Sequence, residues 1–382
     1  MPKTVLSKNY YLTLIATALF TSTYYLLLPV LPLHMQAMGG TNFNIGLIMG
    51  LFSASSLVLR MTMGKACDRI GPVKIMQWTV YAFFLTPLFY LGDSLLLLGA
   101  DQLLYGFTIG SFTVSSATLV TISVEKEQMA QAIGIQSIAL IAAKGFAPTI
   151  GSFIYAHFGL IPVLALTCLL ALATLGVTSR LEELPPAAPD SGISFLKVIS
   201  YRMVWAPSII LITTTFTFGN IMTMLPLLAV ERGIDGYGWF FTINTLAVIC
   251  TRLITGRQEK LSLERLIIFS LVIIFIAVAI LALAYSFQVL AFSAIIYGLG
   301  YGAVYPALSA IVVNNASAGS RGAALGFFTA AFDIGVSLGS VWGGMSEFLN
   351  FTFVYFLASL VPLLGVLCCA FLMKREKIEA ET

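Results

Sequence analysis

Charged residues are scarce in this chain, and their scarcity limits the class of protein that it can be. Only 10% of the 382 residues are charged, whereas 59% are hydrophobic. Soluble domains carry about 25% charged and about 45–50% apolar residues. These proportions exclude a soluble enzyme, a nucleic-acid-binding protein and a disordered chain. We expect lipid to cover most of the surface, and we expect no nucleic acid among the partners.

Histidine and paired cysteine are also in short supply. The chain has two histidines, His34 and His157, and none of its five cysteines forms a Cys-x-x-Cys pair. Metal centres and disulfide frameworks need such clusters, so the sequence predicts no metal site, no cofactor and no catalytic residues. A membrane-embedded enzyme would gather reactive side chains within its spans, and it is the alternative that this composition supports least.

Long hydrophobic runs make up most of what is present. A membrane-spanning helix needs about 20 mostly apolar residues, and continuous rather than alternating runs favour helices over a β-barrel. The sequence predicts an all-α membrane protein with twelve transmembrane helices. The predicted spans cover residues 10–34, 44–63, 73–92, 95–122, 128–157, 160–179, 203–229, 237–256, 264–285, 287–313, 321–346 and 349–373.

One long polar stretch divides the spans into two sets of six. It predicts an N-terminal six-helix bundle over 1–180, a cytoplasmic linker over 181–202 and a C-terminal six-helix bundle over 203–382. With both termini in the cytoplasm, every lysine and arginine except Lys144 and Arg232 lies at a cytoplasmic end or loop. This distribution satisfies the positive-inside rule and predicts the orientation.

The two halves repeat each other at a nearly constant offset. Two motifs recur 192 residues later and one recurs 194 residues later: Arg60-x3-Gly64-Lys65 as Arg252-x3-Gly256-Arg257, Tyr105-Gly106-x3-Gly110 as Tyr297-Gly298-x3-Gly302, and Leu31-Pro32-Leu33 as Leu225-Pro226-Leu227. Parallel repeats of this kind are typical of transporters that hold their substrate between the halves. The sequence therefore predicts two pseudo-symmetric halves.

The loop after the second span resembles a motif of the major facilitator superfamily, G-x-x-x-D-R-x-G-R-[RK]. The matching residues are Gly64, Asp68, Arg69, Gly71 and Lys74. The resemblance implies the major facilitator fold and a loop that latches the two halves during alternating access. We expect Gly64 to allow close helix contact and Asp68 to accept hydrogen bonds at a helix N-terminus. The alternative is a loop that only sets the membrane orientation.

The fifth span, from Gly145 onward, resembles the G-P-x-x-G-G element of proton-coupled antiporters in this superfamily. Pro148 and Gly151 fit this element, and Ala147 and Ser152 stand in place of its other glycines. Small residues allow close helix packing, and the proline frees a backbone carbonyl; ordinary packing is the alternative. In the fourth span Gln102 stands where drug-efflux members carry an arginine, with Asp101 beside it. The resemblance thus implies an antiporter, and this departure keeps a substrate–proton symporter as the alternative.

Two charges lie near the middle of predicted spans, Lys144 in the fifth and Asp333 in the eleventh. A charge at mid-membrane costs about 2.5–3.5 kcal/mol on insertion scales, so we expect both to face a central cavity. Asp333 is the first candidate for carrying a proton or binding a cationic group, and Lys144 is the candidate for a substrate carboxylate. Asp101 is the second proton candidate and the alternative partner of Lys144. The alternative is a Lys–Asp ion pair with a purely structural role.

Several other polar and aromatic residues within spans are candidates for substrate contact, with helix–helix hydrogen bonds as the alternative. They are Tyr24, Tyr25, Gln136, Asn220, Asn244 and Tyr305.

Further segments, Val304-Tyr305-Pro306 among them, resemble bacterial exporters of opine-type metallophores. The resemblance implies a monomeric multi-pass protein of the bacterial inner membrane. Its expected partners are lipid, protons and a small polar or zwitterionic substrate, namely a metallophore, a siderophore or a drug.

Overall fold

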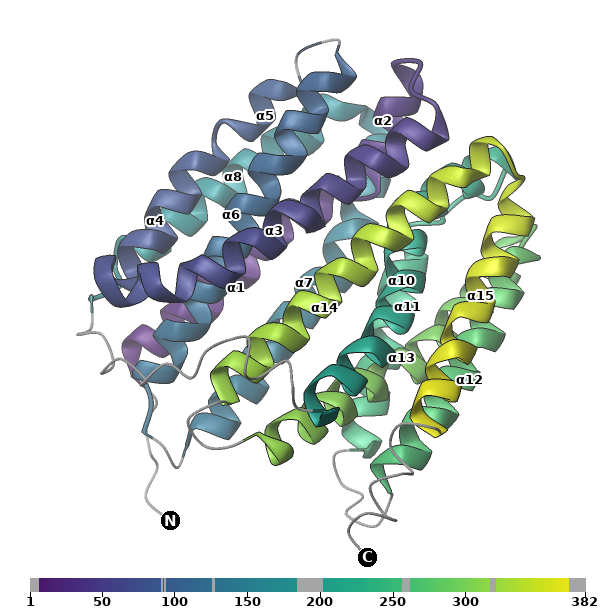
Figure 1. Cartoon of the computed structure of the whole chain (residues 1–382). Helices are drawn as coiled ribbons and strands as arrows, with labels where there is room; N and C mark the ends of the chain where they lie inside the picture. Colours follow the sequence, from purple (N-terminus) through teal and green to yellow (C-terminus); the bar gives the residue numbers. More distant parts are fainter. Residues whose placement is uncertain are drawn as a thin grey trace, which may run out of the picture. The chain divides into compact units, whose positions relative to one another are not determined.

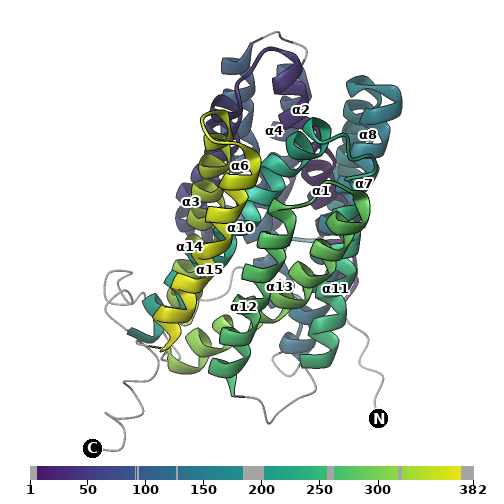
Figure 2. The same ribbon diagram turned by 90° about the vertical axis from the view of Figure 1, so that its right-hand side faces the viewer.

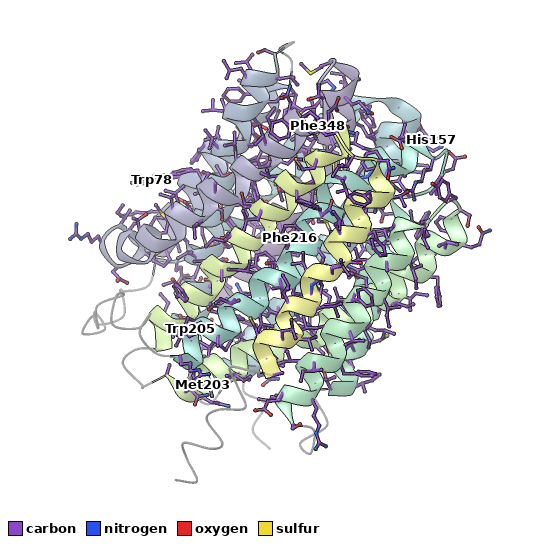
Figure 3. All side chains as sticks on the ribbon, turned by 45° about the vertical axis from the view of Figure 1, so that its right-hand side comes forward. Trp78, His157, Met203, Trp205, Phe216 and Phe348 are labelled. Carbon is purple, nitrogen blue, oxygen red and sulfur yellow. The ribbon has the colours of Figure 1, made fainter. Side chains whose placement is uncertain are left out.

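A computed structural model of the chain describes residues 7–90, 92, 94–125, 128–183, 202–255, 262–316 and 321–370. These residues form helices and no strands (Figure 1). Ten of the described helices are long and apolar enough to cross a membrane. Large apolar side chains cover their outer surfaces: Leu96 is 82% exposed and Trp78, labelled in Figure 3, is 57% exposed. Such a surface suits lipid rather than water.

The chain forms two compact units. Unit 1 comprises residues 1–34 and 54–189, and unit 2 comprises residues 35–53 and 190–382. Helices α2 and α3 contribute to both. The helices before the predicted linker are α1 (Lys8–Leu27), α2 (Val30–Ala37), α3 (Asn42–Ile70), α4 (Pro72–Phe83), α5 (Thr86–Phe89), α6 (Leu95–Ile122), α7 (Met129–Phe158) and α8 (Leu160–Thr178). Those after it are α10 (Arg202–Glu231), α11 (Trp239–Thr255), α12 (Leu263–Ala282), α13 (Phe287–Asn315), α14 (Arg321–Gly344), the 3-10 turn η2 (Met345–Glu347) and α15 (Phe351–Cys368).

The third predicted span, 73–92, is broken. Helix α4 ends at Phe83 and α5 begins at Thr86. Pro87 has no N–H and cannot donate to the carbonyl of Phe83; the Thr86 hydroxyl donates to that carbonyl instead, at 2.7 Å. The eighth predicted span is a helix of 17 residues. These two fall short of a full span, so the count of twelve, like the orientation of the termini, stays a prediction.

In unit 1, α1 packs against α7 and α8, and α4 packs against α6. Aromatic rings fill the space where these helices meet. The ring of Phe20 stacks on Phe112 with centroids 4.2 Å apart and meets Phe83 edge-on at 5.3 Å. Most of the predicted linker, residues 184–201, lies outside the described part of the chain.

In unit 2, α10 packs along α14 (Figure 1), and α13 packs between α11 and α12 (Figure 2). Glycines make the α10–α14 contact possible. A Cβ on Gly219 would overlap the carbonyl of Val336, and a Cβ on Gly339 would overlap the carbonyl of Phe216. The backbones of these two helices therefore touch directly.

Equivalent contacts recur in both units at the offsets that the sequence predicts. Gly110 of α6 packs on Ser56 of α3, and Gly302 of α13 packs on Val248 of α11, with each partner 192 residues further on. In the same way Gly151 meets Leu26, and Gly343 meets Asn220. The offsets here are 192 for the glycine and 194 for its partner. The two units thus use the same helix-packing geometry.

Candidate functional site

Lys144 lies on α7, where that helix faces α1. Its Nζ is 5.6 Å from the centroid of the Tyr25 ring, within cation–π range. Tyr25 meets Tyr24 edge-on at 5.2 Å, and Tyr24 lies 5.4 Å from Tyr105. The structure therefore brings together three of the predicted substrate contacts, Tyr24, Tyr25 and Lys144. A fourth, Gln136, is buried on the same helix two turns earlier.

The predicted packing element follows Lys144 on α7. Pro148 has no N–H, so the carbonyl of Lys144 lacks its ordinary helical donor. A Cβ on Gly151 would overlap the carbonyl of Leu26, so at this point α7 touches the backbone of α1. Gly145 is buried. The element packs α7 closely on α1 about two helical turns after the lysine.

Asp101 is fully buried on α6. Within the described part of the chain neither of its carboxylate oxygens has a hydrogen-bond partner, and the same holds for Gln102 Oε1 and the hydroxyls of Tyr90 and Tyr105. Tyr90 and Gln102 nevertheless lie close enough to act on the charge of Asp101. The tyrosines at 105, 24 and 25 form a continuous chain of rings from this carboxylate to Lys144.

In unit 2, Asp333 is 4% exposed on α14 and follows Phe332 in the chain. Phe332 belongs to a group of aromatic rings from α10, α13 and α14. Tyr305 lies 5.4 Å from Phe328 and 6.3 Å from Phe332, and Phe218 stacks on Tyr301 at 5.3 Å. Of the predicted contacts, Tyr305 therefore belongs to this aromatic group, and Asp333 lies on α14 one residue after Phe332. The tyrosines 297, 301 and 305 are four residues apart, a spacing that marks one helix face and could have revealed Tyr301 in advance.

Asn220 and Asn244 lie elsewhere in unit 2, at helix–helix contacts. A Cβ on Gly343 would meet the Oδ1 of Asn220 at 2.7 Å, and a Cβ on Gly298 would meet the Oδ1 of Asn244 at 3.0 Å. Both asparagines are buried against a neighbouring helix. Their positions favour helix packing over substrate contact.

The predicted latch loop joins α3 to α4. Gly71 has a φ of 100°, in the region that favours glycine, and a Cβ there would overlap the carboxylate of Glu183. That carboxylate accepts the backbone N–H groups of Val73 at 3.3 Å and Lys74 at 3.1 Å. A helix N-terminus favours an anion, and here that anion is the Glu183 carboxylate at the start of α4. The sequence analysis expected Asp68 at a helix N-terminus and did not select Glu183.

Asp68, Arg69 and Lys74 are exposed, and no hydrogen bond of the Asp68 carboxylate is found among the described residues. A Cβ on Gly64 would meet nothing within 4 Å. Among the described residues no atom of a neighbouring helix comes this close, and the close helix contact expected at Gly64 stays a prediction. Its place in a latch stays a prediction.

Two repeated units of apolar helices, with rare charged side chains inside their spans, define a polytopic membrane transporter. The sequence profile of the Major Facilitator Superfamily matches residues 13–257 and 207–382. The chain belongs to this superfamily, as the sequence predicted, and its members are transporters rather than enzymes.

Relatives and solved structures of similar fold cover nearly the whole chain. The Staphylopine export protein of Staphylococcus aureus strain Mu50 is 22% identical over 376 residues, 94% of each chain. The uncharacterized MFS-type transporter YhhS of Escherichia coli strain K12 is 26% identical over 337 residues, 83% of this chain and 80% of its own. The structure of the nucleoside transporter NupG is 14% identical and has a TM-score of 0.77, over 96% of this chain and 100% of its own. The likeness to NupG shows the fold.

Proposed function

We propose that this chain exports a small polar or zwitterionic molecule across a bacterial inner membrane in exchange for protons, as a monomer working by alternating access. Lys144 and Asp333 are the charged contacts for the substrate, and Asp333 and Asp101 are the candidates for carrying protons. Membership of the Major Facilitator Superfamily supports secondary transport. The residues below support the direction and the substrate class.

The contact between Lys144 and Tyr25 is the observation that carries the proposal. An ammonium group within a span costs about 2.5–3.5 kcal/mol on insertion scales, and such groups commonly serve transport. A ring face stabilises a cation without neutralising it, by about 0.5–2 kcal/mol. The Lys144 side chain, over the Tyr25 ring, is therefore the candidate contact for a substrate carboxylate.

Asp333 supplies the opposite charge in unit 2. A carboxylate buried within a span attracts an amine, and Asp333 is 4% exposed on α14. A molecule with both carboxylates and amines carries a counter-charge for each of these two residues, whereas an apolar cationic drug carries one only for Asp333. The similarity to the Staphylopine export protein of Staphylococcus aureus supports a metallophore as the substrate.

The Pro148–Gly151 element supports antiport, and Gln102 in the position of the antiporter arginine favours a symporter as the second candidate. Comparing metabolites inside and outside a deletion strain with those of a complemented strain, in metal-poor and metal-replete medium, separates the two. We expect a compound that is absent from the medium and accumulates in the deletion strain. A nutrient that the deletion strain leaves in the medium would indicate import and would contradict the proposed export.

Complementation with Asp333→Asn tests the proton candidate in the same strains. Asn keeps the size of Asp but cannot give up a proton, so we expect folded protein in the membrane without proton-coupled export. Normal export by this variant would remove Asp333 from the mechanism.

A further inference from the structure

The region around Asp101 gathers unpartnered oxygen atoms inside unit 1. Both carboxylate oxygens, Gln102 Oε1 and the hydroxyls of Tyr90 and Tyr105 are buried without a hydrogen bond of ordinary geometry in the described part of the unit. Tyr90 and Gln102 nevertheless lie within reach of the carboxylate, and Thr86 lies within reach of the Tyr105 hydroxyl. Proteins pair more than about 90% of such groups. Several unpaired groups in one place indicate a site whose hydrogen bonding changes during function.

The repeat provides an internal reference for this region. Residues 192 positions after Asp101 and Tyr105 are Ser293 and Tyr297. The Ser293 hydroxyl donates to the carbonyl of Ala277 at 2.8 Å, and the Tyr297 hydroxyl bonds the Thr217 hydroxyl at 3.0 Å. Unit 2 thus fulfils the structural needs of this position with a small, satisfied side chain. The carboxylate of unit 1 is not required by the packing geometry that both units share.

The surroundings of Asp101 contain few groups that could balance a negative charge. The titratable groups near it are Tyr90 after α5, Tyr105 on α6 and Tyr24 on α1, with Cys168 of α8 near Tyr105. The His34 ring of α2 lies 6.4 Å from the Tyr90 ring. Among the residues that the structure describes, no lysine or arginine acts on the Asp101 carboxylate. An ionised carboxylate buried in this way is strongly unfavourable, and such a group takes up a proton instead.

We propose that Asp101, with the hydroxyls of Tyr90 and Tyr105, is a one-proton site inside unit 1 that is separate from the substrate contact at Lys144. In this conformation the Asp101 carboxyl is protonated, and its O–H can donate a hydrogen bond to a tyrosine oxygen. Discharge requires water or an acceptor to reach Asp101. The proposal rests on the proposed function in taking the proton as the coupling ion and Lys144 as a substrate contact.

The ring chain of Tyr105, Tyr24 and Tyr25 connects this site to Lys144. Its two ring-to-ring contacts are 5.4 and 5.2 Å between centroids, and the ammonium lies 5.6 Å from the last ring. A shift of Tyr25 when a substrate binds Lys144 therefore repositions Tyr105, a member of the proton site. Substrate and proton influence each other without competing for one carboxylate.

Infrared spectroscopy of the purified protein in lipid vesicles tests the site without a substrate. A protonated carboxyl has a carbonyl band that a carboxylate lacks. We expect this band at about pH 7 in the wild type, its loss in Asp101→Asn, and a shift of its frequency in Tyr90→Phe, which removes one hydroxyl. Ser293→Ala, at the equivalent position of unit 2, is the matched control and should leave the band unchanged. Asp333→Asn should also retain it.

Two results would overturn the proposal: a wild type without the band, or a band that survives Asp101→Asn. A band that disappears when sodium replaces potassium would assign Asp101 to a metal cation and would also overturn it. If Asp101→Asn does not fold, Asp101→Ser, which carries the residue of unit 2, replaces it. The result is independent of export, so a failure of the proposed function would leave it standing.

Discussion

The same pair of helices is built in two ways in the two units. In unit 2, Gly219 of α10 brings its backbone against Val336 of α14. By the offsets of the repeat, the corresponding residues of unit 1 are Tyr25 of α1 and Lys144 of α7. One unit has a glycine and a valine in backbone contact, and the other has an aromatic ring beneath an ammonium group.

This difference separates what the fold needs from what transport needs. The close contact in unit 2 shows that small, apolar residues are sufficient to join these two helices. Tyr25 and Lys144 occupy space that packing alone would close, and the lysine adds the cost of a charge within a span. A role in transport is therefore the better explanation for Tyr25 and Lys144. Substitutions in the two units test this difference.

Gly339→Ala should have the largest effect on folding. Its Cβ would overlap the Phe216 carbonyl, and backbone atoms cannot move aside as a flexible side chain can. Overpacking typically costs about 1–3 kcal/mol and more in rigid surroundings. We expect a strongly lowered melting temperature, or no folded protein, in detergent. Phe216, labelled in Figure 3, belongs to α10.

Gly326→Ala on the same helix is the matched control, because its Cβ would meet nothing within 4 Å. Replacing glycine by alanine in a helix stabilises by about 1 kcal/mol. Equal loss of stability in both variants would mean that backbone contact does not explain the role of Gly339.

Lys144→Val, which introduces the residue of unit 2, should have the next largest effect. Losing a charged hydrogen bond of about 1.5–3 kcal/mol corresponds to a loss of substrate affinity of about tenfold to a hundredfold. We expect this loss for anionic substrates, measured as uptake into inside-out vesicles, with unchanged amounts of protein. Tyr25→Phe keeps the ring face and should change affinity by less than about threefold. Equal losses for neutral and anionic compounds would make Lys144 structural.

Glu183→Gln should have the smallest effect. The carboxylate at the N-terminus of α4 contributes about 0.3–1 kcal/mol through the helix dipole. We expect a melting temperature lowered by a few degrees, and less so at high salt, which screens the interaction. Glu182→Gln is the control, because the contacts of Glu182 to Asn9 are made by its backbone. A similar loss in both variants would point to a general effect of charge.

Most of the fold could be predicted because its causes are local or periodic. Apolar runs located the helices, and the offset of the repeat predicted the contacts of Gly110 and Gly302. The break at Thr86 and Pro87 was missed since the run is apolar throughout. Glu183 was assigned to a linker, because its partners on α4 are more than 100 residues away in the sequence.

The site was predictable in part. Rare charges within apolar runs identified Lys144 and Asp101, since a membrane-spanning helix keeps few of them. Which ring lies beneath Lys144, and which hydroxyls surround Asp101, depends on helix rotation, and the sequence does not encode that in any short pattern. Asn220 and Asn244 were selected for polarity alone, and their glycine neighbours became visible only in the folded units.

The break between α4 and α5 has a mechanical consequence. At the start of α4, hydrogen bonds to the Glu183 carboxylate connect the first turn of this helix to the segment after α8. At the other end Tyr90 follows α5 and reaches the region of Asp101. An unbroken helix would carry a displacement of one end to the other, whereas a joint at Thr86 and Pro87 absorbs it. Helix α5 can therefore rearrange while the first turn of α4 keeps its position.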